Sequence, residues 1–141
     1  MKILAGCAVA IGFVLLVLLF NLPDSEHVGP KHFIKVQPKL QDILNQAQHF
    51  TVEPGTRIGT RMDKGKLIRV RSSVDAFLIR NEDGRYFVIV DLGGGFLGTQ
   101  GYIYSEAPNV NITNIAHMPL EESYHLAQLN DHWWSYDGKE D

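Results

Sequence analysis

The amino-acid sequence predicts an α+β protein: an N-terminal transmembrane helix, then a small domain with one amphipathic helix packed on a mostly antiparallel sheet of five to six strands. Three patterns favour this class. Residues 3–20 form an uncharged apolar run, and apolar residues recur at helical spacing over 38–49. From residue 51 onward, short runs of β-branched and aromatic residues alternate with glycine-containing turns, which is typical of strands.

Length and composition restrict the function classes. With 141 residues, the chain has room for one domain after the apolar run. The formal net charge of −3 argues against a protein that binds nucleic acid. Because Cys7 is the only cysteine and lies in the apolar run, we expect the domain to hold no disulfide and to use no thiol chemistry.

The apolar run from Ile3 to Phe20 has the length of a membrane-spanning helix. At 1.5 Å per residue it spans roughly 27 Å, close to the thickness of the hydrocarbon layer. The alternative is a cleaved signal peptide, whose apolar region is shorter, roughly 7–15 residues, and is followed by a pair of small residues at the cleavage site. Residues 21–27 contain no such pair. We therefore expect an uncleaved anchor that holds the protein in a membrane.

The charges that flank the anchor predict its orientation. Lys2 and the α-amino group precede the run, whereas Asp24 and Glu26 are the only charged residues between the run and Lys31. Positive charge at the short end keeps that end in the cytoplasm. The rest of the chain is then expected outside the cytoplasm.

Small residues in the anchor open the possibility of a homodimer. Two pairs have the spacing at which helices approach closely in a membrane. These pairs are Gly6/Ala10 and Ala8/Gly12.

A polar stretch broken by prolines follows the anchor and is interpreted as a tether. We therefore divide the chain into an anchor over 1–22, a tether over 23–30 and an extracytoplasmic domain over 31–141.

The helix of the domain is predicted over residues 38–49, with Pro38 in its first turn. The preceding Phe33, Ile34 and Val36 fit either a further helical turn or an extended lead-in, because a residue before proline avoids the α region. The apolar face of the helix comprises Leu40, Ile43, Leu44 and Ala47.

A hairpin is predicted over 74–80 and 85–92, with Gly84 at the turn. The second of these strands carries apolar residues on both faces and is therefore expected at the centre of the sheet. A two-residue loop would place Glu82 opposite Arg85, whereas a four-residue loop would place two arginines opposite each other, so the shorter loop is favoured. This register stacks Phe77 on Val90 and Ile79 on Val88.

The remaining strands follow from similar runs. In the first of them, Ile68 and Val70 are expected on one face, with Leu67 and two arginines on the other. A helix that begins at Pro119 is an alternative for residues 119–129. The predicted strands are 66–71, 102–105, 110–115, 124–129 and 133–136.

Two groups of side chains are candidate contacts for a partner. One is a basic group, which could also be a solvated face or neutralise the acidic C-terminal part of the same chain. The other is an aromatic group in a strand, where adjacent tryptophans point to opposite faces and one is expected to be partly exposed; the alternative is that both pack beneath the sheet edge. The groups are Arg57, Arg61, Arg69 and Arg71, and Trp133, Trp134 and Tyr136.

The histidines do not have the spacing of a metal site, since none of the six lies within four residues of another. We predict neither a metal nor a cofactor. A small envelope hydrolase that uses His117, His125 or His132 with a carboxylate is the alternative function. The favoured function is a membrane-tethered, non-catalytic binding or accessory module with a protein partner in the cell envelope.

Overall fold

A computed structural model describes residues 28–92, 100–115 and 124–138 of the chain. In these residues one helix packs on a seven-stranded antiparallel sheet, which confirms the α+β class and corrects the number of strands from five or six to seven. The elements are α2 (Pro30–Ala47), β1 (Thr56–Asp63), β2 (Lys66–Arg69), β3 (Ala76–Arg80), β4 (Tyr86–Asp91), β5 (Gln100–Ser105), the 3-10 turn η1 (Ile112–Asn114), β6 (Tyr124–Gln128) and β7 (Trp133–Gly138).

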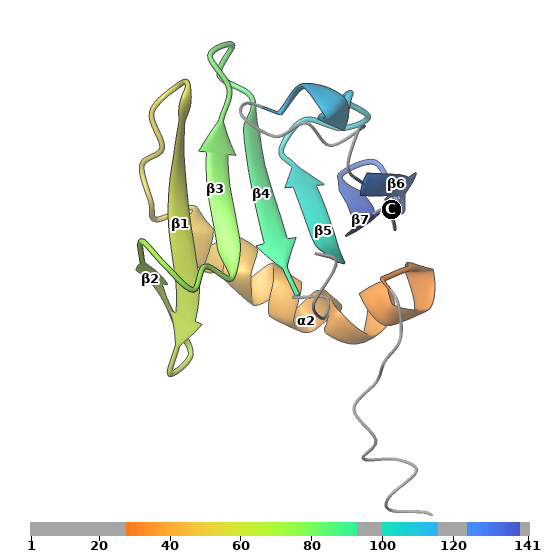
Figure 1. The fold of residues 1–141 in the computed structure, drawn as a ribbon, viewed down its shortest axis with the longest axis horizontal. Helices are drawn as coiled ribbons and strands as arrows, with labels where there is room; N and C mark the ends of the chain where they lie inside the picture. Colours follow the sequence, from red (N-terminus) through yellow and green to blue (C-terminus); the bar gives the residue numbers. More distant parts are fainter. Residues whose placement is uncertain (1–27, 93–99, 116–123, 139–141) are drawn as a thin grey trace, which may run out of the picture.

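The strands follow one another in the order β2-β1-β3-β4-β5-β7-β6. Figure 1 shows α2 crossing one face of this sheet, from β5 and β7 at its N-terminal end to β1 at its C-terminal end, with β2 and β6 at opposite margins. No helix in the described residues is long and apolar enough to cross a membrane. The expected anchor over 3–20 lies outside the described residues.

The helix begins eight residues earlier than the sequence predicts, at Pro30, so that Pro38 lies inside it. Tertiary contacts hold the additional turns. Phe33 is buried, and the centre of its ring lies 5.4 Å from that of Tyr102 and 5.5 Å from that of Trp133. The Tyr102 hydroxyl also lies 2.7 Å from Nδ1 of His32. These contacts with β5 and β7 outweigh the hydrogen bond that a proline removes from a helix.

The larger core lies between α2 and the sheet. Leu40 and Ile43 of the helix pack there against Leu78 of β3 and Val88 and Val90 of β4, and each of these side chains is at most 1% exposed. The helical spacing of apolar residues after Pro38 therefore predicted the buried face correctly.

A second core lies on the other face of the sheet. Phe87 and Ile89 of β4 pack there with Ile112 and Ile115, which belong to the segment around η1. Because β4 is covered on both faces and is the fourth of seven strands, its predicted central position is confirmed.

The segment predicted as a strand over 110–115 instead contains η1. Asn111 is the reason: its Oδ1 accepts hydrogen bonds from the amide of Thr113 at 2.9 Å and from the hydroxyl of Thr113 at 2.6 Å. A side chain that bonds to the backbone two residues ahead closes a turn and competes with strand pairing.

The predicted register of the β3–β4 hairpin is wrong by one residue. The loop has three residues, because Asn81 and Gly84 form a turn in which the amide of Gly84 donates to the carbonyl of Asn81, and Gly84 has φ +87°. The amide of Asn81 then donates to the carbonyl of Arg85, and the guanidinium of Arg85 lies 2.9 Å from the carboxylate of Asp83. A shift of one residue moves each side chain to the other face, so the observed pairs are Phe77 with Ile89, Leu78 with Val88 and Ile79 with Phe87.

The first hairpin also differs from the prediction. The sequence analysis identifies no strand over 56–63, where β1 lies between β2 and β3. In β2 the buried residue is Leu67, whereas Ile68 is half-buried on the opposite face. Leu67 turns toward α2 because the C-terminal end of the helix lies over β2.

The last hairpin, formed by β6 and β7, is confirmed, with Asn130, Asp131 and His132 at its turn. The alternative helix is wrong for residues 124–128, which form β6. Residues 119–123 lie outside the described part of the chain.

Candidate binding surface

The four predicted basic contacts do not share one face of the sheet. Arg57 and Arg61 lie four residues apart on β1 and share the face away from α2. The guanidinium carbon of Arg57 lies 5.4 Å from the centre of the Phe77 ring. Arg69 is paired with Thr60, whose side chain is buried on the α2 face. Arg71 is exposed just beyond β2. Arg57 and Arg61 therefore lie along the same strand, roughly 13 Å apart at 3.3 Å per residue, whereas Arg69 lies on the other face.

The predicted aromatic contacts are buried. Trp133 and Trp134 point to opposite faces, as expected from strand alternation, but each is only 6% exposed. Trp133 packs on the α2 face against Tyr104, with ring centres 5.2 Å apart. Tyr136 packs edge-on against Tyr124 at 5.4 Å. The expectation that one tryptophan is partly exposed is therefore wrong, and the alternative that both are packed is confirmed, because both faces of β7 are covered.

Burial also changes the chemistry of these tyrosines. Burial, together with the nearby charge of Asp91, raises the pKa of Tyr136. Burial and, to a smaller extent, the charge of Glu106 raise the pKa of Tyr104. Both phenols therefore stay neutral at physiological pH and act here as packing groups.

The two described histidines of the alternative hydrolase lie at opposite ends of the last hairpin. His125 stands opposite Asp137, whereas His132 lies at the turn, roughly 17 Å away at 3.3 Å per residue. Nδ1 of His132 lies 2.9 Å from the carbonyl oxygen of Ser105, and its ring stacks on Tyr104. His117 lies outside the described residues. Among the residues that the structure describes, no three histidine, cysteine or carboxylate side chains form a metal-binding group.

A hollow of about 460 Å³ lies beside β6, on the sheet face that α2 leaves free. One wall is the segment 110–113 and the other is β6, with Trp134 contributing to the lining. Near the turn of the last hairpin, Nε2 of Gln128 donates to Oδ1 of Asn109 at 2.9 Å and joins the two walls. The aromatic residue that the sequence analysis selected therefore lies at this hollow, although it is buried.

The outer edge of β6 presents backbone groups away from the sheet. The amide of Leu129 donates to the carbonyl of Trp133 at 2.8 Å, which turns Leu129 toward β7. Since hydrogen-bonded pairs alternate along antiparallel strands, Ala127 also faces β7, and the backbones of Leu126 and Gln128 face outward. Within the described part of the chain, these two outward amides have no hydrogen-bond partner.

The opposite edge of the sheet, β2, is capped at Leu67 by a side chain of α2. The amide of Leu67 donates to Oε1 of Gln46 at 2.7 Å, and Nε2 of Gln46 donates to the carbonyl of Gly65 at 3.0 Å. The side chain of Gln46 therefore occupies the position that the backbone of an added strand would take. Lys66 and Arg69 place charges at the two ends of this short strand, which also discourages pairing.

No protein-family model, curated protein or solved structure matches this chain. The geometry of the domain is therefore the support for a function.

The surroundings of β6 are acidic. The described residues 100–115 and 124–138 contain the carboxylates of Glu106, Asp131 and Asp137 and no lysine or arginine. β6 itself has neither a charged residue nor a proline. An unprotected, uncharged edge strand in acidic surroundings suits an extended segment that carries positive charge.

The sequence analysis did not identify Leu126 and Gln128 as candidate residues. The uncharged composition of the strand was visible in the sequence, and edge strands are commonly protected by charge or proline. Its place at the edge was not visible, because a strand is an edge only by the order of pairing in the folded sheet.

Proposed function

We propose that this protein is a membrane-anchored, non-catalytic binding module of the cell envelope that receives an extended segment of a partner along β6. The single observation that carries the proposal is the edge of β6 beside a hollow: among the described residues, its outward amides at Leu126 and Gln128 have no hydrogen-bond partner, whereas at the other edge Gln46 caps the amide of Leu67. An edge strand whose outward N–H and C=O groups are unpaired is a template for pairing with another chain.

Strand addition explains how such a site would bind. The partner backbone would exchange hydrogen bonds with the outward groups of Leu126 and Gln128, which supplies affinity. Alternate side chains of an added strand point to one face, so every second partner residue would lie over the hollow near Trp134. The size of these side chains would then set specificity, and the acidic surroundings would favour lysine or arginine in the partner segment.

The expected anchor gives the module its place of action. A domain held at a membrane by a short tether meets membrane-bound partners at a raised effective concentration. A modest affinity at β6 is then sufficient for a stable complex in the envelope.

Arg57 and Arg61 are proposed as a second contact, separate from β6. Five strand spacings lie between β1 and β6, which is roughly 24 Å at 4.8 Å per strand. A small partner would therefore contact one of the two surfaces, and variants of each surface distinguish them.

The test uses the full-length chain in its native membrane. A topology reporter after Asp141 is expected to report a location outside the cytoplasm. A photoreactive side chain in place of the exposed His125 is expected to give a cross-linked adduct of defined size, whereas the same side chain in place of Lys66 on β2 is expected to give none.

A matched pair of variants shows whether the adduct depends on strand addition. Gln128→Pro removes the outward amide, and Gln128→Ala keeps it while removing the same side-chain hydrogen bonds. We expect the adduct to fall at least ~10-fold in the first variant and to persist in the second, since one backbone hydrogen bond and the fit of the added strand are lost. Equal adducts in both variants would contradict strand addition.

Charge reversal at both Arg57 and Arg61 tests the second contact. If this variant keeps the adduct formed at His125 at full yield, the basic pair takes no part in the complex. If the adduct falls while the unfolding temperature stays unchanged, both surfaces contribute.

A further inference from the structure

We propose that the N-terminal half of α2 lies on an anionic lipid surface, so that the domain docks on the bilayer through its helix. This inference rests on the membrane anchor of the proposed function and concerns a surface that the partner segment does not use. It follows from three features of the helix: its exposed side chains, the positive charge near its N-terminal end, and its distance along the chain from the anchor.

Three lysines and an isoleucine share the exposed face of the helix. Lys31, Lys35 and Lys39 are spaced four residues apart and therefore lie on one face, and all three are exposed. Ile34, on the same face, is 69% exposed and is the exposed large hydrophobic residue of the described chain. Lysines beside an exposed apolar side chain are typical of helices that lie at a membrane interface.

Lys31 stands where a positive charge does not favour the stability of the helix. The N-terminal end of a helix carries partial positive charge, so that acidic residues stabilise the first turn and basic residues stabilise the last. α2 has no acidic residue in its first turn and no basic residue in its last turn, and Lys31 stands at its second position. A negatively charged lipid surface outside the domain would give this unfavourable position of Lys31 a physical reason.

The cationic half of the helix is the half nearest to the anchor. Nine residues separate Phe20, at the end of the apolar run, from Pro30, at the first position of α2. Fully extended, they reach at most roughly 30 Å. Lysines on so short a tether meet the lipid headgroups at high effective concentration.

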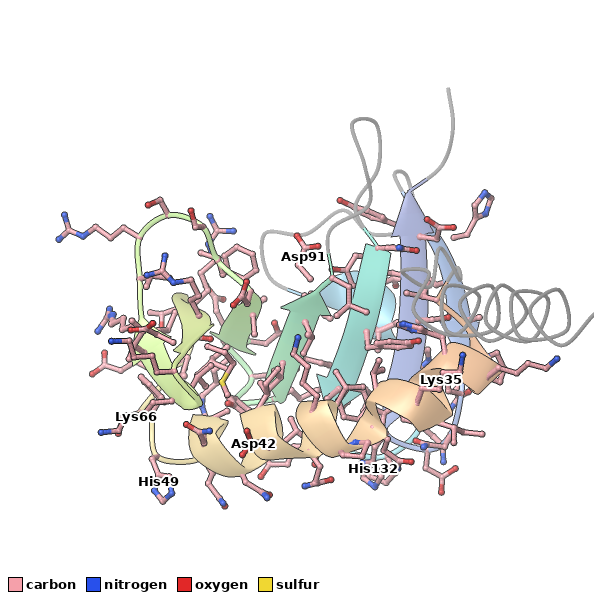
Figure 2. All side chains as sticks on the ribbon, turned by 90° about the horizontal axis from the view of Figure 1, so that it is seen from below. Lys35, Asp42, His49, Lys66, Asp91 and His132 are labelled. Atoms are coloured by element: carbon pink, nitrogen blue, oxygen red, sulfur yellow. The ribbon has the colours of Figure 1, made fainter. Side chains whose placement is uncertain are left out.

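The C-terminal half of the helix differs in charge. Figure 2 shows α2 crossing in front of the sheet, with Lys35 on its N-terminal half, Asp42 on its C-terminal half and His49 beyond its C-terminal end. After Lys39 the helix contains no lysine or arginine, and Asp42 is its acidic residue. The positive charge is therefore confined to the part of the helix that the tether brings to the membrane.

Docking through α2 leaves the binding edge accessible. The hollow beside β6 opens on the sheet face opposite α2, so a lipid surface on one side and a partner segment on the other can be bound together. The lipid contact would then orient β6 relative to the membrane.

The test places a fluorescent label near the expected contact. The full-length chain, with Cys7→Ser and Ile34→Cys, is labelled and incorporated into nanodiscs of phosphatidylcholine with or without phosphatidylglycerol, together with a lipid that carries a quencher at its headgroup. We expect strong quenching in the anionic discs and weak quenching in the neutral ones. A label at Asn45, on the same exposed face of the C-terminal half, is expected to be quenched less.

Two matched charge variants separate specific docking from net charge. Each surface lysine contributes about 5-fold to binding at an anionic membrane, so Lys31→Glu with Lys39→Glu is expected to lower the docked fraction relative to the undocked by at least ~25-fold. Lys64→Glu with Lys66→Glu makes the same change in net charge at the β1–β2 turn and is expected to have no effect.

The outcomes distinguish this inference from the proposed function. Incorporation into the discs with an unquenched Ile34 label, or quenching that survives reversal of Lys31 and Lys39, overturns lipid docking and leaves the binding module standing. Failure of the full-length chain to incorporate into any disc overturns the anchor, and with it both proposals.

Discussion

The two edge strands of the sheet, β2 and β6, differ in the hydrogen bonds of their outward backbone groups. At β2, Gln46 from α2 bonds to both Leu67 and Gly65, so the outer side of the strand is occupied by a side chain of the same domain. At β6, the outward amides of Leu126 and Gln128 have no such partner among the described residues. In the part of the chain that the structure describes, a side chain therefore caps the edge at β2 but not the outward amides of β6.

The difference indicates that edge protection here depends on where the helix lies. α2 starts over β5 and β7 and ends near β2 (Figure 1). Its last turn carries Gln46, whose side chain bonds at the β2 edge. Among the described residues, no side chain of α2 bonds to the outward amides of Leu126 and Gln128 at the other edge. A sheet capped at β2, with outward amides at β6 that have no partner in the described residues, favours strand addition at β6, which suits a module that binds one partner segment at a time.

The largest expected effect separates the two sides of β6 itself. Ala127→Pro removes an amide that faces β7, whereas Gln128→Pro removes one that faces outward. We expect the first change to lower the free energy of unfolding by on the order of 2 kcal/mol and the second to have the small effect of Gln128→Ala. Urea unfolding of the three variants measures this, and equal losses for both prolines would reverse the assignment of the outer edge.

A smaller effect is expected at β2. Gln46→Ala removes two hydrogen bonds from the edge and is expected to lower the free energy of unfolding by about 1 kcal/mol, with faster hydrogen exchange at the Leu67 amide. Gln48→Ala, at the exposed residue just after the helix, is the control and is expected to change neither quantity. Unchanged exchange at Leu67 in the Gln46 variant would mean that this edge needs no cap.

The smallest effect at neutral pH is expected at Tyr86 of β4, in the centre of the sheet. Because β4 is not an edge strand, a variant of Tyr86 serves as a reference for the variants of β6 and β2. The hydroxyl of Tyr86 is buried without a hydrogen-bond partner among the described residues. Burial raises the pKa of Tyr86 to about 12, against the opposing effect of the Arg80 guanidinium, whose carbon lies 5.5 Å from the ring centre.

Since an unfolded tyrosine ionises near pH ~10, the folded state holds the Tyr86 proton more tightly. The corresponding stability is complete below pH ~10 and is lost as the pH rises toward about 12. Tyr86→Phe is expected to keep or slightly raise stability at pH 7 and to lose less of it over this alkaline range. Thermal unfolding at pH 7 and across the alkaline range measures the stability of the native protein and the variant. If the stability of both proteins falls in parallel as the pH rises, the assignment to Tyr86 is contradicted.

Much of the domain could be predicted where the pattern is local. The repeat of Leu40 and Ile43 identified the buried face of α2, and apolar residues on both faces of 85–92 placed β4 at the centre. Errors arose where a distant contact decides. Helix α2 extends back past Pro38 because Phe33 packs on β5 and β7. The error in the β3–β4 loop is different, because it is local: Gly84 has the expected positive φ, but in a three-residue loop whose turn bond joins Gly84 to Asn81.

The candidate site was predictable in part. The sequence analysis selected Trp134, which lies at the hollow. It expected either Trp133 or Trp134 to be partly exposed or, as the alternative, both to be packed, and both are buried. It grouped Arg57 with Arg69, which the pairing of β1 with β2 places on opposite faces. Leu126 and Gln128 were missed because neither has a side chain that marks a binding site.

Periodicity and polarity along the chain were sufficient for the kinds of element and for most of their positions, since both depend on neighbours a few residues away. Strand order, register and the cap at Gln46 required the folded sheet, because each depends on which segments distant in the chain come to lie together. The same principle applies to the binding edge. The residues of β6 are ordinary as a sequence, and only the packing of the other six strands leaves their backbone facing outward.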